Sequence, residues 1–458
     1  MLAAPCDGTT RMLEGECSGL ALRLDSGDRM LDGLWRWSRS VAHALIAPNG
    51  VIMTGALGYS AKCHVGQDVP FVFPLFLLDP HPRLRAAAET TLRMVVESPS
   101  AREGRGILDH PCEGLDFAFA PMRPASARLW RRFGAAGLLR WILCAERLLA
   151  AGNQELARAA FTLFAEKVAA HYLPFDPKSE CWSAGEETQE LAYSLPTAVA
   201  AFGALERMAR HFGDARFGGE LARARAAIRE FLERPLAAGG LRLTEPLTRG
   251  GVTLAAGWLA QRSFLERDPP WFGFDFPLVA GHALVHEALS PEVAARVAAL
   301  LADPDGDFRV KGEGIAKSPG GEKGVWFWHN GLAALGLARA GQIDAADALF
   351  ASMARGVADV NGLGIPGEEV NGGDYAMGIG ALAGLCLLEA LLGLTSEGAA
   401  TRLRPRLPSR LERVVVERLM VGGRPRRIEI VRRGAGPLIA SESLVVPPDR
   451  DELRFELA

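Results

Sequence analysis

Cysteine and tyrosine are scarce in this sequence of 458 residues, which has seven Cys and four Tyr. The cysteines lie far apart and include no CxxC pair, an odd and scattered set that is typical of reduced thiols rather than of a disulfide framework or a zinc site. The first ten residues, MLAAPCDGTT, have neither the basic region nor the apolar stretch of a secretory signal. We therefore expect a cytoplasmic protein.

Long apolar runs and an excess of one charge are also missing. The longest apolar stretch, 376–394, is interrupted by Gly and Glu and does not have the length of a clean transmembrane helix. The net charge of −3 gives no electrostatic reason to expect a nucleic acid or an anionic membrane as partner. We expect neither, and the composition leaves the oligomeric state open.

Motifs for cofactors and metals are absent as well. The sequence has no GKS/T phosphate loop, no GxGxxG after a strand, no HExxH and no cluster with metal-ligand spacing. We expect no organic cofactor and no catalytic metal.

Helical periodicity dominates the sequence from about residue 29 to residue 395, with almost no strand signal. Twelve or thirteen helices are predicted. The strongest candidates are 83–97, 126–151, 154–171, 193–212, 216–233, 291–302, 325–340, 343–357 and 375–394, and weaker ones are 29–47, 69–78, 250–264 and 277–289.

The spacing of the helices predicts pairs. Links within a pair are tight, as at 150–154, 211–215 and 339–343, where Gly suits a helix C-terminus. Links between pairs are long and rich in Gly, Pro, Trp and acidic residues. Long loops without secondary structure usually have a function, so their recurrence indicates one functional face over a helical scaffold. We predict an all-α (α/α)6 toroid of six helical hairpins; a repeat solenoid is the competing architecture.

The sequence pattern changes from helical to strand-like near residue 403. RVVVERLMV and RPRRIEIVRR flank Gly-Gly, which is a hairpin signal, and strand-like stretches follow at 437–446 and 452–457. We predict an N-terminal segment (1–28), a helical-barrel domain (29–398) and a small C-terminal β unit (399–458) that acts as a structural cap.

Three segments place carboxylates just before helices. In CHVGQDVPFVFPLFLL (63–78), Asp68 stands at a helix N-terminus, where it is either a helix cap or a ligand for sugar hydroxyls. In ECWSAGEETQELAYSLPTAV (180–199), Glu186 and Glu187 follow Trp182. Adjacent carboxylates raise each other's pKa, as a general acid requires, although acidic residues also favour the first turn of a helix.

The third segment is IPGEEVNGGDY (365–375). It places Glu368 and Glu369 in a Gly/Pro/Asn-rich loop ahead of an apolar helix. Two Glu-Glu pairs in equivalent positions, late in the loops between hairpins, are more informative than either pair alone.

These segments, in this order, resemble the six-hairpin glycoside hydrolases, namely glucoamylases of glycoside hydrolase family 15 and the amylo-α-1,6-glucosidase domain of glycogen-debranching enzymes. The resemblance covers roughly 30–425. It implies a glycosidase that acts on an oligosaccharide or glycoside with inversion, with Glu186 as general acid, Glu368 as general base and Asp68 holding the terminal sugar. Glu187 and Glu369 are the alternatives within each pair. The sequence departs from the family at Gln67, in place of Arg, and at Gly185, in place of Trp.

Further residues are candidates for contacts with the sugar, because aromatic faces stack on the C–H faces of sugars. Trp326, Trp328 and His329 lie in VWFWHNG, which opens a predicted helix. Trp182 is a second candidate for an aromatic wall. His64 and Asp116 are candidates for binding hydroxyl groups.

Two other function classes fit the same toroid. A disaccharide phosphorylase would need phosphate in place of the base, and a sugar epimerase would need two histidines across the cavity, for which His64 and His329 are the only pair offered. The third class is a non-catalytic toroid that binds glycans or proteins.

Overall fold

The computed structural model describes residues 21–47, 49–54, 68–97, 134–179, 182, 190–249, 252–259, 276–306, 308–316, 324–358, 367–369, 372–375, 379–433, 436–441, 444–445 and 453–455. These residues contain twelve α-helices, two antiparallel sheets and three small hairpins. Within this part of the chain, no helix combines the length and the apolar character needed to cross a membrane.

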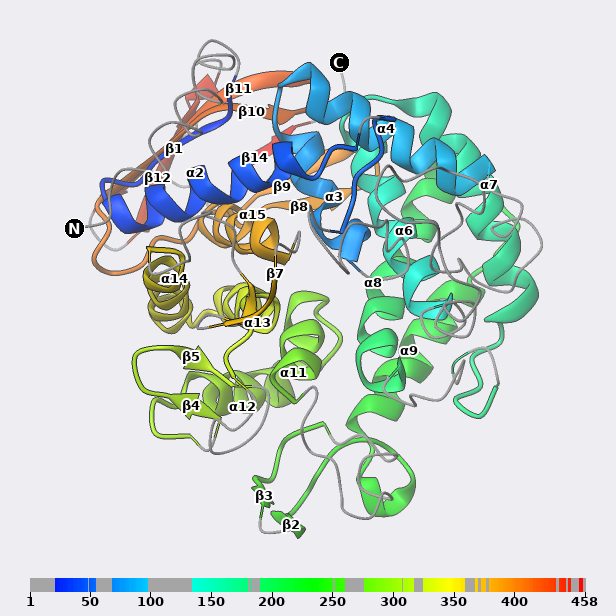
Figure 1. Ribbon diagram of the computed structural model, residues 1–458. Coiled ribbons are helices and arrows are strands. Elements are labelled where there is room, and N and C mark those ends of the chain that lie inside the picture. Colours follow the sequence, from blue (N-terminus) through cyan, green and yellow to red (C-terminus); the bar gives the residue numbers. More distant parts are fainter. Residues whose placement is uncertain are drawn as a thin grey trace.

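Six of the described helices form an inner ring. They are α3 (Asp68–Leu78), α6 (Gly134–Ala150), α8 (Glu190–Phe212), α11 (Phe276–Val285), α13 (Phe327–Arg339) and α15 (Ile379–Leu392). Each contacts the next in this order, and α15 returns to contact α3 (Figure 1). The ring is closed, which confirms the predicted (α/α)6 toroid and excludes the open solenoid.

Three of the inner helices, α3, α11 and α15, are apolar on nearly every face. The sequence of α3 is DVPFVFPLFLL and that of α15 is IGALAGLCLLEALL. A helix that is apolar all round is stable only when it is buried on all sides. These two sequences therefore suit helices enclosed between the interior of the ring and an outer layer.

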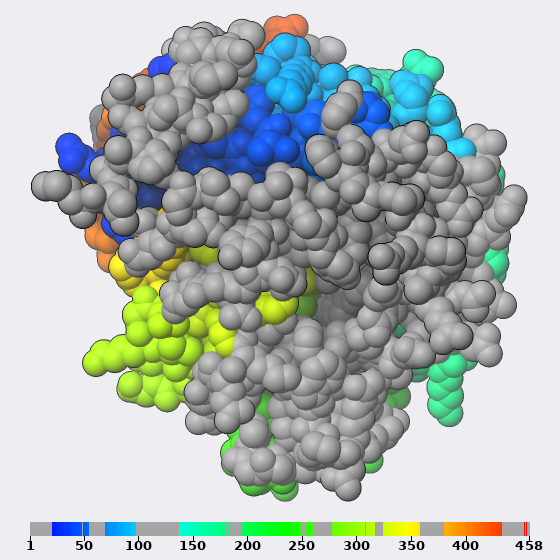
Figure 2. Space-filling model, viewed as in Figure 1, coloured from blue at the N-terminus to red at the C-terminus, as the bar shows by residue number. Residues whose placement is uncertain are grey.

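Six further helices form that outer layer. They are α2 (Arg29–Ala44), α4 (Pro82–Glu97), α7 (Gln154–His171), α9 (Glu220–Glu233), α12 (Pro291–Ala302) and α14 (Ile343–Ala358). They are amphipathic: α4 buries Leu84, Ala88, Leu92 and Val95, spaced by three and four residues. Figure 2 shows α2 (dark blue) and α4 (light blue) at the molecular surface, as expected for outer helices.

Five of the six helical pairs are consecutive along the chain. α4 packs on α3, α7 on α6, α9 on α8, α12 on α11 and α14 on α13. The predicted helices 154–171 and 291–302 coincide with α7 and α12, and the weaker candidates 29–47, 69–78 and 277–289 correspond to α2, α3 and α11. The predicted pairing of consecutive helices into helical hairpins is confirmed.

The sixth pair joins the two ends of the helical region. α2 packs on α15, and the Ser38 hydroxyl donates to the carbonyl of Gly380 (3.1 Å) and accepts from the backbone N–H of Gly384 (3.0 Å). A Cβ at position 384 would lie 2.4 Å from the Cβ of Ser38. Glycine is therefore required for α2 and α15 to approach so closely, and this contact completes the toroid.

The C-termini of four inner helices meet at one side of the ring. Glu389, in the last turn of α15, accepts from Arg147 near the end of α6 (2.6 Å) and from Arg339 at the end of α13 (3.5 Å). Arg339 also donates to the carbonyl of Val285, the last residue of α11. We call this side the far end.

The opposite side, where the inner helices begin, is the loop end. The short connections that leave inner helices are 79–81, 151–153, 213–219, 286–290 and 340–342, and the long connections that lead into inner helices are 45–67, 98–133, 172–189, 234–275, 303–326 and 359–378. The long connections thus enter the ring at the N-termini of its helices.

The C-terminal β unit contains the predicted hairpin. β10 (Arg413–Val421) and β11 (Arg424–Arg433) pair antiparallel, with Val416 opposite Ile428. Gly422 and Gly423 form the turn with φ angles of 57° and 73°, the left-handed region that a two-residue turn of this kind requires. The strands β12 (Gly436–Ser441) and β13 (Leu444–Val445) extend this sheet.

Two further features of the β unit were not predicted. β1 (Arg23–Asp25), from the N-terminal segment, pairs with β10, with Leu24 opposite Val416. A second sheet combines β8 (Thr395–Glu397), β9 (Ala400–Leu403) and β14 (Leu453–Phe455). β1 thus supplies an edge strand of the five-stranded sheet, which joins residues 23–25 to the C-terminal unit.

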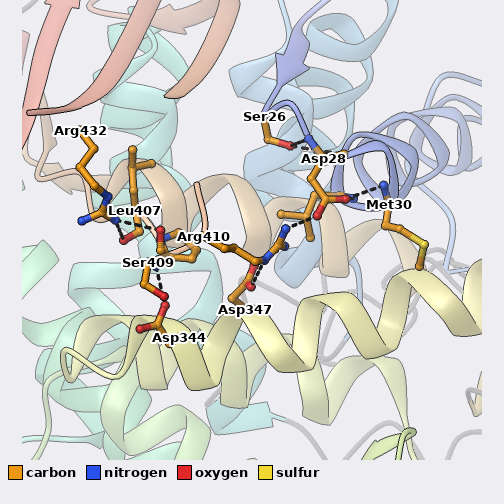
Figure 3. Close-up of polar contacts among 11 residues, drawn as sticks. Ser26, Asp28, Met30, Asp344, Asp347, Leu407, Ser409, Arg410 and Arg432 are labelled. Carbon is orange, nitrogen blue, oxygen red and sulfur yellow. Dashed lines mark hydrogen bonds and ion pairs between the residues drawn. The ribbon is translucent and has the colours of Figure 1, made fainter. Parts of the chain in front are cut away.

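Arg410 ties the β unit to two outer helices (Figure 3). Its guanidinium donates to both oxygens of Asp347 in α14, with Nη2 2.8 Å from Oδ1, and also to Asp28, the N-cap of α2. Burial raises the pKa of Asp28, but hydrogen bonds from Arg410 and from the N–H groups of Met30 and Leu31 more than offset this and leave it lowered. The Asp28 carboxyl group that bonds Arg410 is therefore held in its ionised form.

One helix prediction is wrong. The segment 250–264 was expected to be helical, but β2 (Leu247–Arg249) and β3 (Val252–Leu254) form an antiparallel hairpin here, and none of the described residues up to 259 is helical. Gly-Gly between β-branched residues is the same hairpin signal that was recognised at 422–423. The remaining short elements are the 3-10 turn η3 (Leu236–Ala238), β4 (Arg309–Val310) and β5 (Gly314–Ile315).

Candidate active site

Two of the three predicted carboxylate segments have described backbone at the loop end. Asp68 is the first residue of α3, as predicted. Glu368 and Glu369 belong to β6 (Gly367–Glu369), which precedes α15 along the chain. The other predicted residues of these segments, His64, Glu186 and Glu187, lie outside the described residues, as does Asp116.

Glu368 is carried by a hairpin rather than by the expected irregular loop. β6 pairs with β7 (Gly372–Tyr375), with Gly367 opposite Tyr375 and Glu369 opposite Gly372. The strand β6 also contacts α13. The backbone of a paired strand against an inner helix is held more firmly than that of an open loop.

The aromatic segment at the start of α13 divides between surface and core. Trp326 is half-buried and stacks on His329, with ring centroids 5.7 Å apart. Trp328 and His329 are only 6% and 1% exposed. Of the three rings predicted to contact substrate, only Trp326 therefore has appreciable exposed surface in this structure.

Asn330 fixes this segment to the neighbouring β5. Its side chain accepts from the N–H of Ile315 (2.8 Å) and donates to the carbonyls of Ile315 (2.9 Å) and Trp326 (2.8 Å). Three hydrogen bonds of a fully buried amide hold the backbone of Trp326 in one place. Asn330 is therefore a positioning residue for the loop end that the sequence analysis did not single out.

Trp182, the other predicted aromatic residue, is packed among buried aromatic rings. Its ring is 1% exposed and packs edge-on against Tyr172 (5.1 Å) and Phe175 (5.6 Å), with Phe202 of α8 at 6.5 Å. The ring belongs to the core between α7 and α8. The local sequence does not distinguish a tryptophan in a long connection that packs inward from one that faces a ligand.

A layer of side chains crosses the interior of the ring. Phe71 of α3 contacts His282 of α11, on the opposite side of the ring, at 5.5 Å, and Trp328 of α13 at 5.3 Å. The guanidinium carbon of Arg140 in α6 lies 4.1 Å from the Phe71 ring centroid. Burial lowers the pKa of His282 well below its ordinary value, and His286 and Arg140 lower it further. The layer is thus built around a neutral imidazole.

Phe71, Arg140 and His282 were missed by the sequence analysis. The available signal was a charged residue and a histidine inside otherwise apolar helical segments, LLRWILC and LVAGHALV. A buried polar group of this kind is expensive unless it has partners, so such positions are worth singling out in any inner helix.

Comparisons with known proteins point to one structural class. No known protein family matches the sequence, and no curated protein is similar to it. Solved structures do match. A variant of a glycosidase aligns with 14% identity and a TM-score of 0.53 over 79% of this chain and 97% of its own. A glycosidase variant in complex with glucose gives 13% and 0.51 with the same coverage.

A third match is an α-L-rhamnosidase from Aspergillus terreus, with 11% identity and a TM-score of 0.57. The alignment covers 94% of this chain and 47% of the rhamnosidase, so this chain spans about half the length of that protein. At such low identities these likenesses establish the fold that the chain shares with glycosidases.

Proposed function

We propose that this protein is a glycoside hydrolase that cleaves an α-glucosidic or related bond with inversion of the anomeric configuration. The observation that carries the proposal is the arrangement of the toroid, in which every long connection leads into the N-terminus of an inner helix. Three of these connections carry or adjoin the carboxylates Asp68, Glu186 and Glu368. The fold shared with solved glycosidases supports the same reading.

The proposed mechanism uses two carboxyl groups on opposite faces of the sugar. Glu186 protonates the leaving oxygen, and Glu368 activates a water molecule that attacks the anomeric carbon. In an inverting enzyme the two groups stand about 6.5–9.5 Å apart, which leaves room for the water. Asp68 accepts hydrogen bonds from hydroxyls of the terminal sugar, and Trp326 supplies an aromatic face beside it.

A substrate screen tests this reaction class. Aryl glycosides and oligosaccharides are incubated with the protein, and NMR follows the first anomer formed. We expect release of free sugar with the configuration opposite to that of the substrate. A product of unchanged configuration, cleavage that requires phosphate, or an epimer formed without cleavage would each overturn the proposal.

Matched variants test the residue assignment. Glu186→Gln and Glu368→Gln should each lower kcat by about 10²- to 10⁴-fold, the usual contribution of a general acid or base. The neighbouring Glu187→Gln and Glu369→Gln are the controls and should retain most of the activity. If a control variant lost activity while its partner kept it, the assignment within that pair would be wrong.

The acid and the base can be told apart by the leaving group. A good leaving group such as dinitrophenolate needs little protonation, so Glu186→Gln should lose much less activity on the dinitrophenyl glycoside than on an oligosaccharide. Glu368→Gln should lose activity on both. Equal losses for Glu186→Gln on the two substrates would contradict its role as the acid.

A further inference from the structure

A cavity of about 260 Å³ lies inside the ring on the side of the far end. Phe71 and Arg140 of the central layer form one boundary, and β8 and Arg402 of β9 border it at the far end. Pockets for drug-sized ligands usually begin at about 300 Å³. The cavity is therefore suited to a small molecule and not to an oligosaccharide.

The walls of this cavity carry an excess of positive charge. Among the described residues that line it are seven arginines and four glutamates, namely Glu146, Glu287, Glu389 and Glu397. Glu206, which lies outside the lining, pairs with Arg225 at 3.2 Å and reduces the excess from three charges to two. His286 also lines the cavity, and burial, followed by Arg339 and Arg140, lowers its pKa to about 3, so it is neutral at pH 7.

Two of these guanidinium groups are brought together at a glycine. Arg207 of α8 donates to both oxygens of Glu146 (2.6 and 2.9 Å). Arg225 reaches the cavity from the outer helix α9 by passing over Gly203, where a Cβ would lie 3.2 Å from Arg207 Nη1 and from Arg225 Cζ. The absence of a side chain at Gly203 lets an outer-layer arginine contribute to an interior cavity.

The electrostatics of Arg225 reflect this crowding. Burial lowers its pKa most, Arg229 and Arg207 lower it further, and Glu206 only partly offsets them. Like charges held this close cost free energy unless a counter-charge is present.

Two arginines of the cavity wall, Arg147 and Arg225, also have buried N–H donors. Arg147 donates through Nη2 to Glu389, yet its Nη1 is buried and has no hydrogen-bond partner among the described residues. The same holds, within the described part of the chain, for Nε of Arg225. A buried donor without a partner lowers the stability of the folded state, and an oxyanion provides several acceptors at once.

We propose that the far-end cavity is a binding site for a small oxyanion with two negative charges, of the phosphate type. Arg225 and Arg147 supply the unpaired donors, and Arg207 sets the position of Arg225 beside it. Guanidinium groups suit this role because their planar fork matches the oxygens of a phosphate. The site stands apart from the loop end and does not rest on the proposed hydrolase function.

Isothermal titration with inorganic phosphate tests the site directly. The titration is made on the full chain at pH 7.5, with sodium chloride at matched ionic strength as the reference, and sulfate and citrate as further oxyanions. We expect saturable binding of phosphate at one site and a rise in Tm that follows the concentration of phosphate. Phosphate that binds no better than chloride would overturn the proposal.

Variants link the binding to the cavity. Arg225→Gln should weaken phosphate binding by about tenfold or more, the usual effect of losing a charge-assisted hydrogen bond. Gly203→Ala should weaken it as well without removing any charge, because the new Cβ displaces the two guanidinium groups. Glu397→Gln, which removes the carboxylate 3.1 Å from Arg402, should strengthen binding severalfold.

Arg216→Gln is the matched control, since Arg216 pairs with Asp214 and does not line the cavity. Its phosphate affinity should stay within about twofold of the unmodified protein. Circular dichroism and Tm confirm that each variant is folded. Binding that is unchanged in both Arg225→Gln and Gly203→Ala would place the phosphate elsewhere and refute the assignment.

Discussion

The two ends of the toroid are built from the same six inner helices but use polar residues differently. At the loop end, the predicted carboxylates precede the helices on long connections or short hairpins. At the far end, charged side chains belong to the helices themselves and pair with one another across the ring, as Glu389 does with Arg147 and Arg339. We therefore expect these buried pairs of the far end to contribute to stability, and the predicted carboxylates of the loop end to be replaceable at little cost to the fold.

A pair of glutamates gives the sharpest contrast between the ends. Glu389 is buried and paired, so Glu389→Gln leaves two half-buried guanidinium groups short of a counter-charge. We expect the free energy of unfolding to fall by about 3 kcal/mol. Glu368→Gln at the loop end should change it by less than about 0.5 kcal/mol. Urea titrations of both variants measure this, and equal losses would erase the distinction between the ends.

The seam between α2 and α15 offers a test by glycine substitution. Gly384→Ala places a Cβ 2.4 Å from the Cβ of Ser38, and the two helices must separate. We expect a loss of about 1–3 kcal/mol. Gly33→Ala in α2 is the control, because nothing lies within 4 Å of its new Cβ. It should stabilise the protein by about 0.5–1 kcal/mol, and thermal unfolding compares the two variants.

Acid should weaken the scaffold through histidines that are buried in the neutral form. His43 of α2 is 5% exposed, and burial, followed by the charges of Arg39, His81 and Arg83, lowers its pKa to about 3. Between about pH 6.5 and 3, His43 is protonated in the unfolded chain but neutral in the folded chain. The free energy of unfolding therefore falls as the pH is lowered through this range.

Urea titrations at pH 7.0 and 4.5 measure this effect. His43 should account for a loss of about 2 kcal/mol, and His43→Gln should remove that part of the pH dependence. The exposed His211→Gln is the control and should leave the difference between the two pH values unchanged. An unaltered pH dependence in His43→Gln would show that its imidazole is protonated in the folded state.

The smallest effect is expected at the seam of the β unit. Arg410→Gln loses the ion pairs to Asp28 and Asp347, but the arginine side chain is 39% exposed, which screens these charges. We expect a loss of about 1 kcal/mol in the free energy of unfolding, with Arg93→Gln, whose pair with Glu97 is exposed, close to zero. A loss above about 3 kcal/mol would make this seam as important as the far end.

The helices of this fold were predictable because each carries its own periodic pattern. α7 and α12 coincide with their predicted bounds, since cap residues and Gly or Pro mark their ends. The hairpin at Gly422 and Gly423 was equally local. Pairings between distant segments were not predictable, as between β1 and β10, because three residues of strand carry too little pattern to identify a partner.

The candidate site was predictable only in part, for a related reason. Local sequence placed Asp68 at the start of α3 and Glu368 just before α15. It does not tell which aromatic rings are buried, as Trp182, Trp328 and His329 are in this structure. The pairing of Arg147 with Glu389 spans 242 positions. No local pattern could have predicted the far-end cavity.

The seam between α2 and α15 also has a consequence for how the protein is made. Ser38 and Gly384 are 346 positions apart. At a synthesis rate of about 5–20 residues per second, α2 leaves the ribosome roughly 20 to 70 s before α15 is made. During that interval the apolar helices between them form an open arc whose two edges are exposed to solvent. We therefore expect nascent chains of this protein to be prone to aggregation until α15 is made and closes the ring.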